Sequence, residues 1–350
     1  MELNFDLLKR ICEAPGIPGR EEQPREIAAA ELRALADEVR VDALGNVIAT
    51  KHGNGGPRVM IAAHLDEIGF MVRHVDDQGY VRLQNVGGFD ARMLAAQRVL
   101  VHGYGGEVLR GALMPGAKPI HVLQPDEVKP LKLQDFYVDL GLSAEEVRSK
   151  VEIGDMVTMD RTLERVGHNV MSKSLDDRVS VFIMIEALRQ LGDHQAEIVA
   201  VATTQEEVGL RGAGTAAFGV DPDIGVALDV TIAGDIPGFE AAERVAKLGD
   251  GVGIKVFDSS HIPNHRLVRH FRQVAEQHGI KYQLEVLARG GTDAGAMQRT
   301  RAGMPAITLS TPTRYLHTVN EMASVDDIQG TIQLLARYLE AAHAGDYRLG

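Results

Sequence analysis

Two adjacent acids, Glu206 and Glu207, follow the run EIVAVATT, whose apolar composition is typical of a buried strand. Two other apolar runs end in a similar way, since His64 and Asp66 follow VMIAA and Asp229 follows DIGVAL. In open α/β sheets, ligands bind beyond the carboxyl ends of the strands. We therefore expect these side chains to converge on one site although they are distant in the sequence.

Two further segments carry groups of the same kind. KSLDDR places Asp176 and Asp177 just before a helix, and LSTPTRYLHT places His317 in the loop after another apolar strand. Singly, each residue has an ordinary explanation: an aspartate can cap the helix that begins near Val179, and a loop histidine is commonly a surface residue. Asp229 could be a turn residue, and the doublet a solvated loop. Together, one shared site is the simpler explanation, although spacing alone does not separate Asp176 from Asp177.

This set of side chains suits a metal site. Zn²⁺ accepts histidine nitrogen and carboxylate oxygen, and Co²⁺ and Mn²⁺ use similar ligands. Two histidines and three carboxylates suffice for two ions that share one carboxylate and lie roughly 3.5–4 Å apart. Hydrolysis also needs a further carboxylate that takes a proton from the attacking water and delivers it to the leaving group. Because neighbouring side chains of an extended segment point in different directions, one glutamate of the doublet can bind metal while the other faces the water.

Strands and helices must position these residues. Their alternation before about residue 70 and after about residue 166 predicts an α/β fold with a mixed, mainly parallel sheet and helices on both faces. Between them the chain is rich in short Val/Leu runs, glycines and turns. We therefore predict a discontinuous catalytic domain, 1–70 and 166–350, and an inserted small β-rich domain, 71–165.

The bulk properties of the 350 residues restrict the partners. The formal net charge is −12, and no cluster of Lys and Arg suggests nucleic acid or an anionic membrane as a partner. No signal peptide or membrane-spanning run is visible, so we expect a cytoplasmic protein. Cys12 shares an apolar helical face with its neighbours, which predicts packing. His261 and His265 match no ligand position, and we interpret them as surface or helix-start residues.

The motifs as a set resemble a known family. AAHLDEIGF, KSLDDR, TTQEEVGLRGA, ALDV, GGTDAGA and RYLHTVNE occur in the order and spacing of the tetrahedral (TET-type) dinuclear metallo-aminopeptidases, some of which carry glutamyl aminopeptidase or endoglucanase labels. The resemblance covers essentially the whole chain. It implies a zinc-exopeptidase-like catalytic domain and a PDZ-like insert.

The resemblance also implies roles for individual residues. It makes Asp176 the ligand shared by two divalent ions, Zn²⁺ or Co²⁺. His64 and Asp229 would complete one ion, and Glu207 and His317 the other. Glu206 would be the general base, and Asp66 a catalytic carboxylate that orients His64, as metal-binding histidines commonly require.

The loop GGTDAGA resembles one close to the family's active site, which implies that Thr292 and Asp293 bind substrate. The alternative that either residue only caps the next helix stays open.

Family members assemble through the insert into dimers and then into hollow dodecamers. By resemblance we expect a homo-oligomer of this kind, acting on short peptides.

The leading hypothesis is a metal-dependent aminopeptidase that removes N-terminal residues from short peptides. One alternative is an N-acyl amino acid deacylase that uses the same water activation. Another is a glycoside hydrolase, but its two carboxylates must flank the scissile bond about 5–9.5 Å apart, which adjacent Glu206 and Glu207 satisfy poorly. A non-enzymatic scaffold is a third alternative, although every expected ligand position is filled.

Overall fold

The computed structural model describes residues 3–118, 121–122 and 130–349, and the chain forms two compact units. The larger unit comprises residues 1–67, 162–316 and 320–350, and the smaller unit comprises residues 68–161 and 317–319. The predicted insert, 71–165, includes positions 119–120 and 123–129, which lie outside the described residues.

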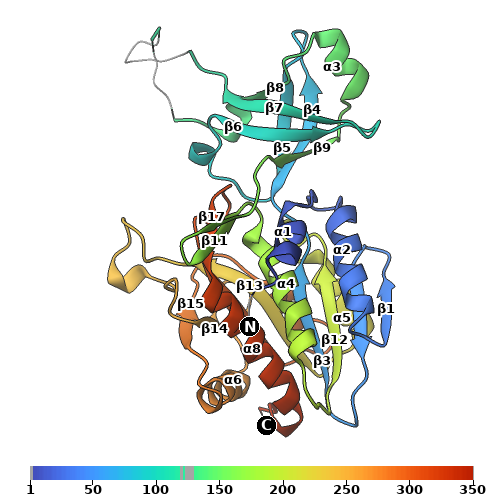
Figure 1. Ribbon diagram of the computed structural model, residues 1–350, viewed down its shortest axis with the longest axis vertical. Helices are drawn as coiled ribbons and strands as arrows, with labels where there is room; N and C mark the ends of the chain where they lie inside the picture. The colour runs from blue at the N-terminus through green and yellow to red at the C-terminus, as the bar shows by residue number, and fades with distance from the viewer. Residues whose placement is uncertain (1–2, 119–120, 123–129, 350) are drawn as a thin grey trace. The chain divides into compact units, whose positions relative to one another are not determined.

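The larger unit contains helices and strands in alternation (Figure 1). Its helices are α1 (Phe5–Glu13), α2 (Glu22–Arg33), α4 (Leu175–Gln190), α5 (Arg211–Val220), α6 (His265–Gln277), α7 (Asp293–Gln298) and α8 (Val325–Ala341). Its strands are β1 (Glu38–Val41), β2 (Val47–Lys51), β3 (Arg58–His64), β10 (Glu164–Val166), β11 (Asn169–Ser172), β12 (Glu197–Thr203), β13 (Ile224–Ile232), β14 (Val252–Phe257), β15 (Tyr282–Val286), β16 (Ala306–Arg314) and β17 (Glu321–Ser324).

These strands form one mixed sheet of 11 strands. Its main path runs β1-β2-β12-β3-β13-β16-β17-β11-β10, and β14 joins β16 and carries β15 at the edge. The central strands β12, β3, β13 and β16 are parallel to one another. Because parallel strands end at the same edge, their carboxyl ends bring distant parts of the sequence together. The predicted fold class is confirmed.

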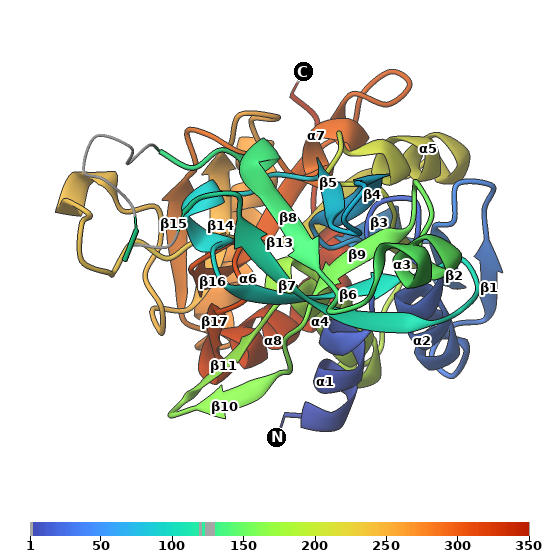
Figure 2. The ribbon, with the colours of Figure 1, turned by 90° about the horizontal axis from the view of Figure 1, so that it is seen from above.

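Helices cover both faces of this sheet, as buried parallel strands require. One face packs against α1, α2, α4, α6 and α8, with Val59, Ile61 and Ala63 pointing into that core. The alternate residues Met60 and Ala62 point into a second core with α5 and α7. Figure 2 shows α5 and α7 on the other side of the sheet from α1, α4 and α8.

Two sequence patterns explain how helices on the first face form. Helix α4 is apolar nearly all round, VSVFIMIEAL, because it lies buried between the sheet, α1 and α8. Helix α1 buries one stripe, Leu7, Leu8, Ile11 and Cys12, so the predicted packing role of this cysteine is confirmed.

The smaller unit is a closed antiparallel barrel in the order β4-β5-β8-β7-β6-β9. Its strands are β4 (Gly69–Val75), β5 (Val81–Val86), β6 (Gln97–His102), β7 (Val108–Pro115), β8 (Phe136–Asp139) and β9 (Met156–Met159), accompanied by helix α3 (Ala144–Lys150). Alternate residues such as Val99 and Val101 fill its separate core. Strand β4 pairs with β9 and closes the barrel, so among the described residues the barrel has no edge strand.

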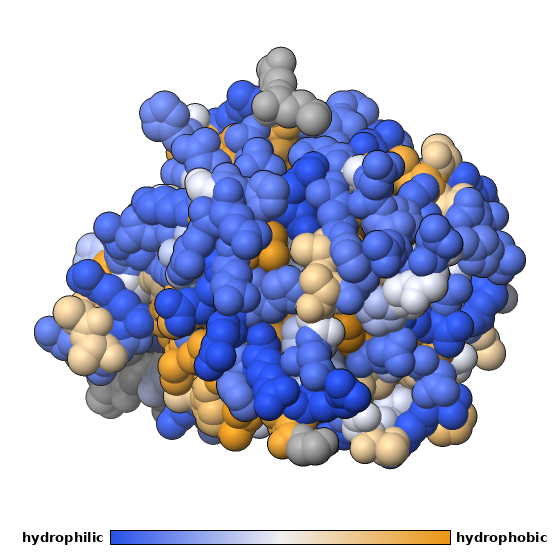
Figure 3. Space-filling view, turned by 90° about the horizontal axis from the view of Figure 1, so that it is seen from below, coloured by the Kyte–Doolittle hydropathy of each residue, from blue (hydrophilic) through white to orange (hydrophobic). Residues whose placement is uncertain are grey.

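The face of the molecule seen in Figure 3 is mostly hydrophilic, and its apolar side chains gather only in small groups. Among the described residues, no helix is both long enough and apolar enough to cross a bilayer.

Candidate metal centre

His64 is the last residue of β3 and lies opposite Thr203, the last residue of β12. Its ring is 2% exposed. The Nδ1 atom lies 3.0 Å from the main-chain oxygen of Asp66, and Nε2 lies 3.1 Å from Oδ1 of Asp176. The imidazole is therefore held through one nitrogen, while the other faces a carboxylate.

Three side chains of the larger unit come together at the carboxyl ends of its strands. One potential ligand atom each of His64, Asp176 and Asp229 lies within 4.8 Å of the other two. Asp229 comes from β13 and is buried, and Asp176 comes from the start of α4. A carboxylate oxygen of Asp176 also lies within 4.8 Å of one from Glu207. Asp176 thus stands between two potential ligand groups.

The two neighbouring aspartates have different partners. Oδ2 of Asp177 accepts the main-chain N–H of His64 at 3.1 Å, whereas Asp176 approaches the imidazole ring itself. The main-chain N–H of Asp176 donates to Oε2 of buried Glu321 at 3.0 Å. Asp177 therefore supports the backbone of a ligand candidate, while Asp176 offers its own carboxylate to the group.

The Glu206–Glu207 doublet is held by Asp66, whose side chain is fully buried. Oδ1 of Asp66 accepts the main-chain N–H of Glu206 and Oδ2 accepts that of Glu207, both at 3.0 Å. The same carboxylate lies 3.7 Å from Nδ1 of His64, farther than the main-chain oxygen. Asp66 thus orients the doublet by its side chain and His64 by its main chain.

Burial and crowding of carboxylates dominate the electrostatics of this group. Burial raises the pKa of Glu206 well above its usual range, although His64, 3.8 Å away, opposes the shift. Burial likewise raises the pKa of Asp229, reinforced by the negative charge of Asp176. For His64, burial lowers the pKa, but the surrounding carboxylates, Glu206 foremost, outweigh it and hold the pKa well above its usual range.

These residues fit a divalent cation. Nitrogen of histidine and oxygen of carboxylate are the donors that Zn²⁺ and Co²⁺ accept. The group concentrates more carboxylates than cationic side chains, and a bound cation would offset their repulsion. The side chain of Glu206 is 11% exposed, which makes a freely solvated loop an inadequate description of the doublet.

Three other predicted residues lie as follows. Thr292 is buried and its hydroxyl contacts Asp258 at 3.1 Å and Thr308 at 2.7 Å. Asp293 is buried at the start of α7 and accepts a 2.6 Å hydrogen bond from the hydroxyl of Thr203; burial raises its pKa to about 6. Substrate binding by Thr292 and Asp293 stays a prediction.

His317 groups with the smaller unit, and its Nδ1 lies 2.8 Å from the main-chain oxygen of Gly88.

One interpretation of a histidine was wrong. His261 is 4% exposed and is neither a surface nor a helix-start residue. Its Nδ1 lies 2.9 Å from Oδ2 of buried Asp258, within ion-pair distance of that carboxylate. His265 does begin helix α6, as expected.

Two acids that contact this region were given no role from the sequence. Glu321 accepts the N–H of Asp176, and Glu21 accepts the N–H of Gln205 at 3.2 Å. Glu21 follows the turn PGIPG and carries no local pattern of a functional residue. Glu321 ends the quoted motif RYLHTVNE, which was used only for His317, whereas for Glu21 the only available signal was its charge.

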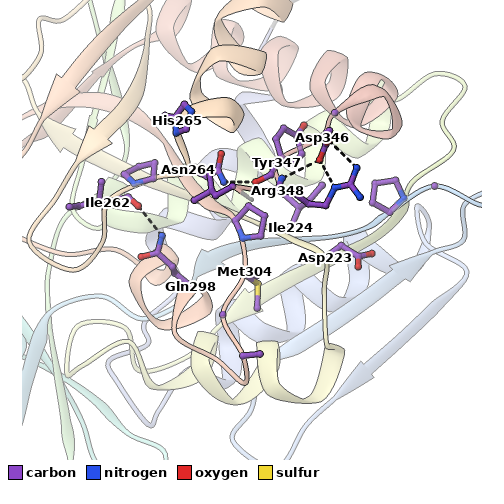
Figure 4. A pocket seen from close by; sticks show the side chains of 18 of the residues that line it. Asp223, Ile224, Ile262, Asn264, His265, Gln298, Met304, Asp346, Tyr347 and Arg348 are labelled. Carbon is purple, nitrogen blue, oxygen red and sulfur yellow. Dashed lines mark hydrogen bonds and ion pairs between the residues drawn. The ribbon is translucent and has the colours of Figure 1, made fainter.

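A separate hollow of about 1140 Å³ lies at the opposite end of the sheet (Figure 4). It is lined by residues at the amino ends of β13 and β16, such as Ile224 and Pro305, and by the segment 345–349. Its polar contacts are internal: Nδ2 of Asn264 donates to the main-chain oxygen of Tyr347 at 2.8 Å. None of the candidate ligands lines this hollow.

The fold is shared with solved aminopeptidase structures. Residues 45–334 match the family model described as M42 glutamyl aminopeptidase, and the chain therefore belongs to this family. It is an aminopeptidase by membership, and the resemblance noted in its motifs is confirmed.

Individual relatives match over nearly the whole chain. The lysyl aminopeptidase of Pyrococcus furiosus is 38% identical over 352 residues, covering 99% of each chain. The TET aminopeptidase structure from Thaumarchaeota archaeon SCGC AB-539-E09 is 36% identical, with a TM-score of 0.92 and coverage of 96% of this chain and 95% of that chain. The TET1 peptidase of Pyrococcus horikoshii, 32% identical with a TM-score of 0.84 over 96% and 98%, can assemble into a tetrahedron or a large octahedral shell.

Proposed function

We propose that this aminopeptidase uses two divalent ions to remove the N-terminal residue from short peptides. The observation that carries the proposal is the grouping of His64, Asp176 and Asp229 within 4.8 Å, with Asp176 equally close to Glu207. A carboxylate placed between two sets of potential ligands is what a paired-ion site requires.

In this proposal His64, Asp176 and Asp229 would hold one ion, and Asp176, Glu207 and His317 would hold the other. The ions are Zn²⁺ or Co²⁺, for which a cysteine-free nitrogen and oxygen donor set is suited. The assignment of His317 rests on the motif RYLHTVNE and on family membership.

Bound ions would supply Lewis-acid polarisation of the scissile carbonyl and would acidify the attacking water. Glu206 acts as the general base that accepts the proton of this water and later gives it to the leaving amine. Burial suits Glu206 to the first of these steps, because its raised pKa makes the carboxylate a stronger base. Asp66 keeps Glu206 and Glu207 in fixed relative positions through their main-chain amides.

We further propose that the β-rich insert is a PDZ-like dimerisation domain and that dimers build a dodecamer in the cytoplasm. The assembly proposal is supported by the Pyrococcus horikoshii TET1 structures, one of which is described as a dodecamer. A cage would admit short peptides and exclude folded proteins.

The test is a panel of aminoacyl-nitroanilides and short peptides, each with a free and an N-acetylated amine, assayed after chelation and after adding back Zn²⁺, Co²⁺ or Mn²⁺. We expect metal-dependent release of the N-terminal residue only from free amines. Comparable cleavage of acetylated substrates would replace the proposal with a deacylase. Chelator-insensitive hydrolysis of cellulose derivatives, with inert peptides, would favour a glycoside hydrolase.

A further inference from the structure

Three consecutive main-chain amides lead into the proposed catalytic doublet, and all three point at buried carboxylates. The N–H groups of Glu206 and Glu207 donate to the two oxygens of Asp66, as described above. The N–H of Gln205 donates to Oε1 of Glu21 at 3.2 Å. Glu21 comes from the amino-terminal part of the chain and is 1% exposed.

The backbone at this point is unusual for a residue with a side chain. Gln205 has a φ of 56°, in the left-handed region that favours glycine. Such a conformation persists only where the surroundings hold it, and it often occurs where a side chain must be aimed. Here it lies immediately before Glu206, so a return of Gln205 to ordinary strand geometry would redirect the doublet.

Glu21 is itself firmly placed. Its Oε1 also accepts the N–H of Gly19 at 2.7 Å, so one oxygen joins the amino-terminal loop to the doublet. The preceding part of this loop is fixed by Arg178, which is fully buried and donates to the main-chain oxygens of Ala14 at 2.9 Å and Gly16 at 3.1 Å. Arg178 lies two residues after Asp176 in the sequence.

The same loop is tied to the segment that carries His64 and Asp66. The N–H of Glu67 donates to the main-chain oxygen of Gly16 at 2.9 Å, and Oε1 of Glu67 accepts the N–H of Gly16 at 3.2 Å. The loop before α2 therefore connects three segments that carry proposed site residues.

We propose that Glu21 is a positioning residue for the Glu206–Glu207 doublet, acting by holding Gln205 in its left-handed conformation. The inference rests on the proposed roles of the two glutamates. Both hydrogen bonds described for the Glu21 side chain go to main-chain amides, so its removal should leave the metal stoichiometry intact and should mainly misplace the base.

The experiment compares Glu21→Ala with Glu21→Gln in the full chain. We expect Glu21→Ala to lower kcat by about 10–100-fold with a KM change below about threefold, since misplacement by about 1 Å can cost about 100-fold. Glu21→Gln should stay within about threefold of the wild type, because its amide oxygen can still accept both N–H groups. Gln205→Gly combined with Glu21→Ala should recover part of kcat, because glycine adopts a positive φ without strain.

Asp327→Ala is the matched control. Asp327 is a buried carboxylate that also accepts two loop amides, those of Gly249 at 2.6 Å and Gly251 at 2.8 Å, but that loop carries no site residue. It should lower stability while kcat stays within about twofold. Equal loss of kcat in both alanine variants, or wild-type kcat in Glu21→Ala, would overturn the inference.

Hydrogen exchange gives a readout that does not depend on catalysis. The amides of residues 205–207 should exchange at least tenfold faster in Glu21→Ala than in the wild type and should be unchanged in Asp327→Ala. Unchanged protection in Glu21→Ala would overturn the positioning role even if kcat fell. If exchange is faster in Glu21→Ala but the wild type shows no aminopeptidase activity, the positioning role stands and only the proposed function is rejected.

Discussion

Replacing Asp66 should lower the free energy of unfolding and the metal affinity more than replacing a surface carboxylate would. Its buried side chain accepts the N–H groups of Glu206 and Glu207, so Asp66→Ala removes the acceptor of two part-buried amides. An unpaired buried amide costs about 1–3 kcal/mol, so we expect a loss of at most about 6 kcal/mol in the free energy of unfolding. Asp66→Asn keeps one acceptor oxygen and should lose about half as much.

Metal binding should fall as well, because Asp66 also adjoins His64. Outer partners of metal ligands typically contribute about 10–100-fold in affinity, and we expect a weakening in that range. Urea unfolding and titration calorimetry with Zn²⁺ measure the two effects. Asp76→Ala is the control, since Asp76 accepts the amides of Gln78 at 3.1 Å and Tyr80 at 2.9 Å in the smaller unit. Wild-type metal affinity and an unchanged unfolding midpoint in Asp66→Ala would refute the reasoning.

Three further predictions concern the base, the insert and pH. Glu206→Gln should keep both ions and lose about 10²–10⁴-fold in kcat, whereas Glu207→Gln should lose metal first; metal analysis beside kcat would expose swapped roles. Deleting residues 71–165 with a short linker should abolish the native oligomer, and an unchanged particle by light scattering would contradict the dimerisation role. Burial raises the pKa of Asp327 to about 6, so the folded chain binds more protons than the unfolded chain between about pH 4 and 6, and this group's contribution to the free energy of unfolding falls as pH rises. Asp327→Asn should make that decline shallower in urea titrations. The same pH dependence in the variant and the wild type would exclude the effect.

The central fold could be predicted because its signals are local. Strands β3, β12, β13 and β16 are continuous apolar runs, and a run of this kind indicates burial without knowledge of its partners. Helix α5 was not anticipated, since its sequence RGAGTAAFGV contains three glycines. Gly212 is needed there because a Cβ atom would lie 2.4 Å from both Oδ1 of Asn46 and the main-chain oxygen of Thr204. That close approach is a tertiary contact without a local pattern.

Strand β14 was missed for a related reason. Its interior residue Lys255 is polar, and its burial depends on Glu285 of β15, whose Oε1 lies 2.8 Å from the lysine Nζ. The approach of His64, Asp176 and Asp229 could be expected because each stands at a strand end or helix start on one edge of the sheet. The supporting contacts of Glu21 and Glu321 could not be expected. They join segments that are remote in the sequence, and neither side chain has a local sequence pattern that indicates such a contact.

The strand order of the sheet determines when its strands can pair during synthesis. Strand β12 lies between β2 and β3, so these two strands, which are synthesised earlier, cannot pair with each other and must wait for a strand that ends at Thr203. At about 5–20 residues per second, that interval is on the order of ten seconds. Throughout it, β3, which ends at His64, lacks both of its neighbouring strands, β12 and β13. The smaller unit, which is nearly continuous in sequence, can form its barrel during this wait, whereas the group of His64, Asp176 and Asp229 also requires β13, which ends at Ile232.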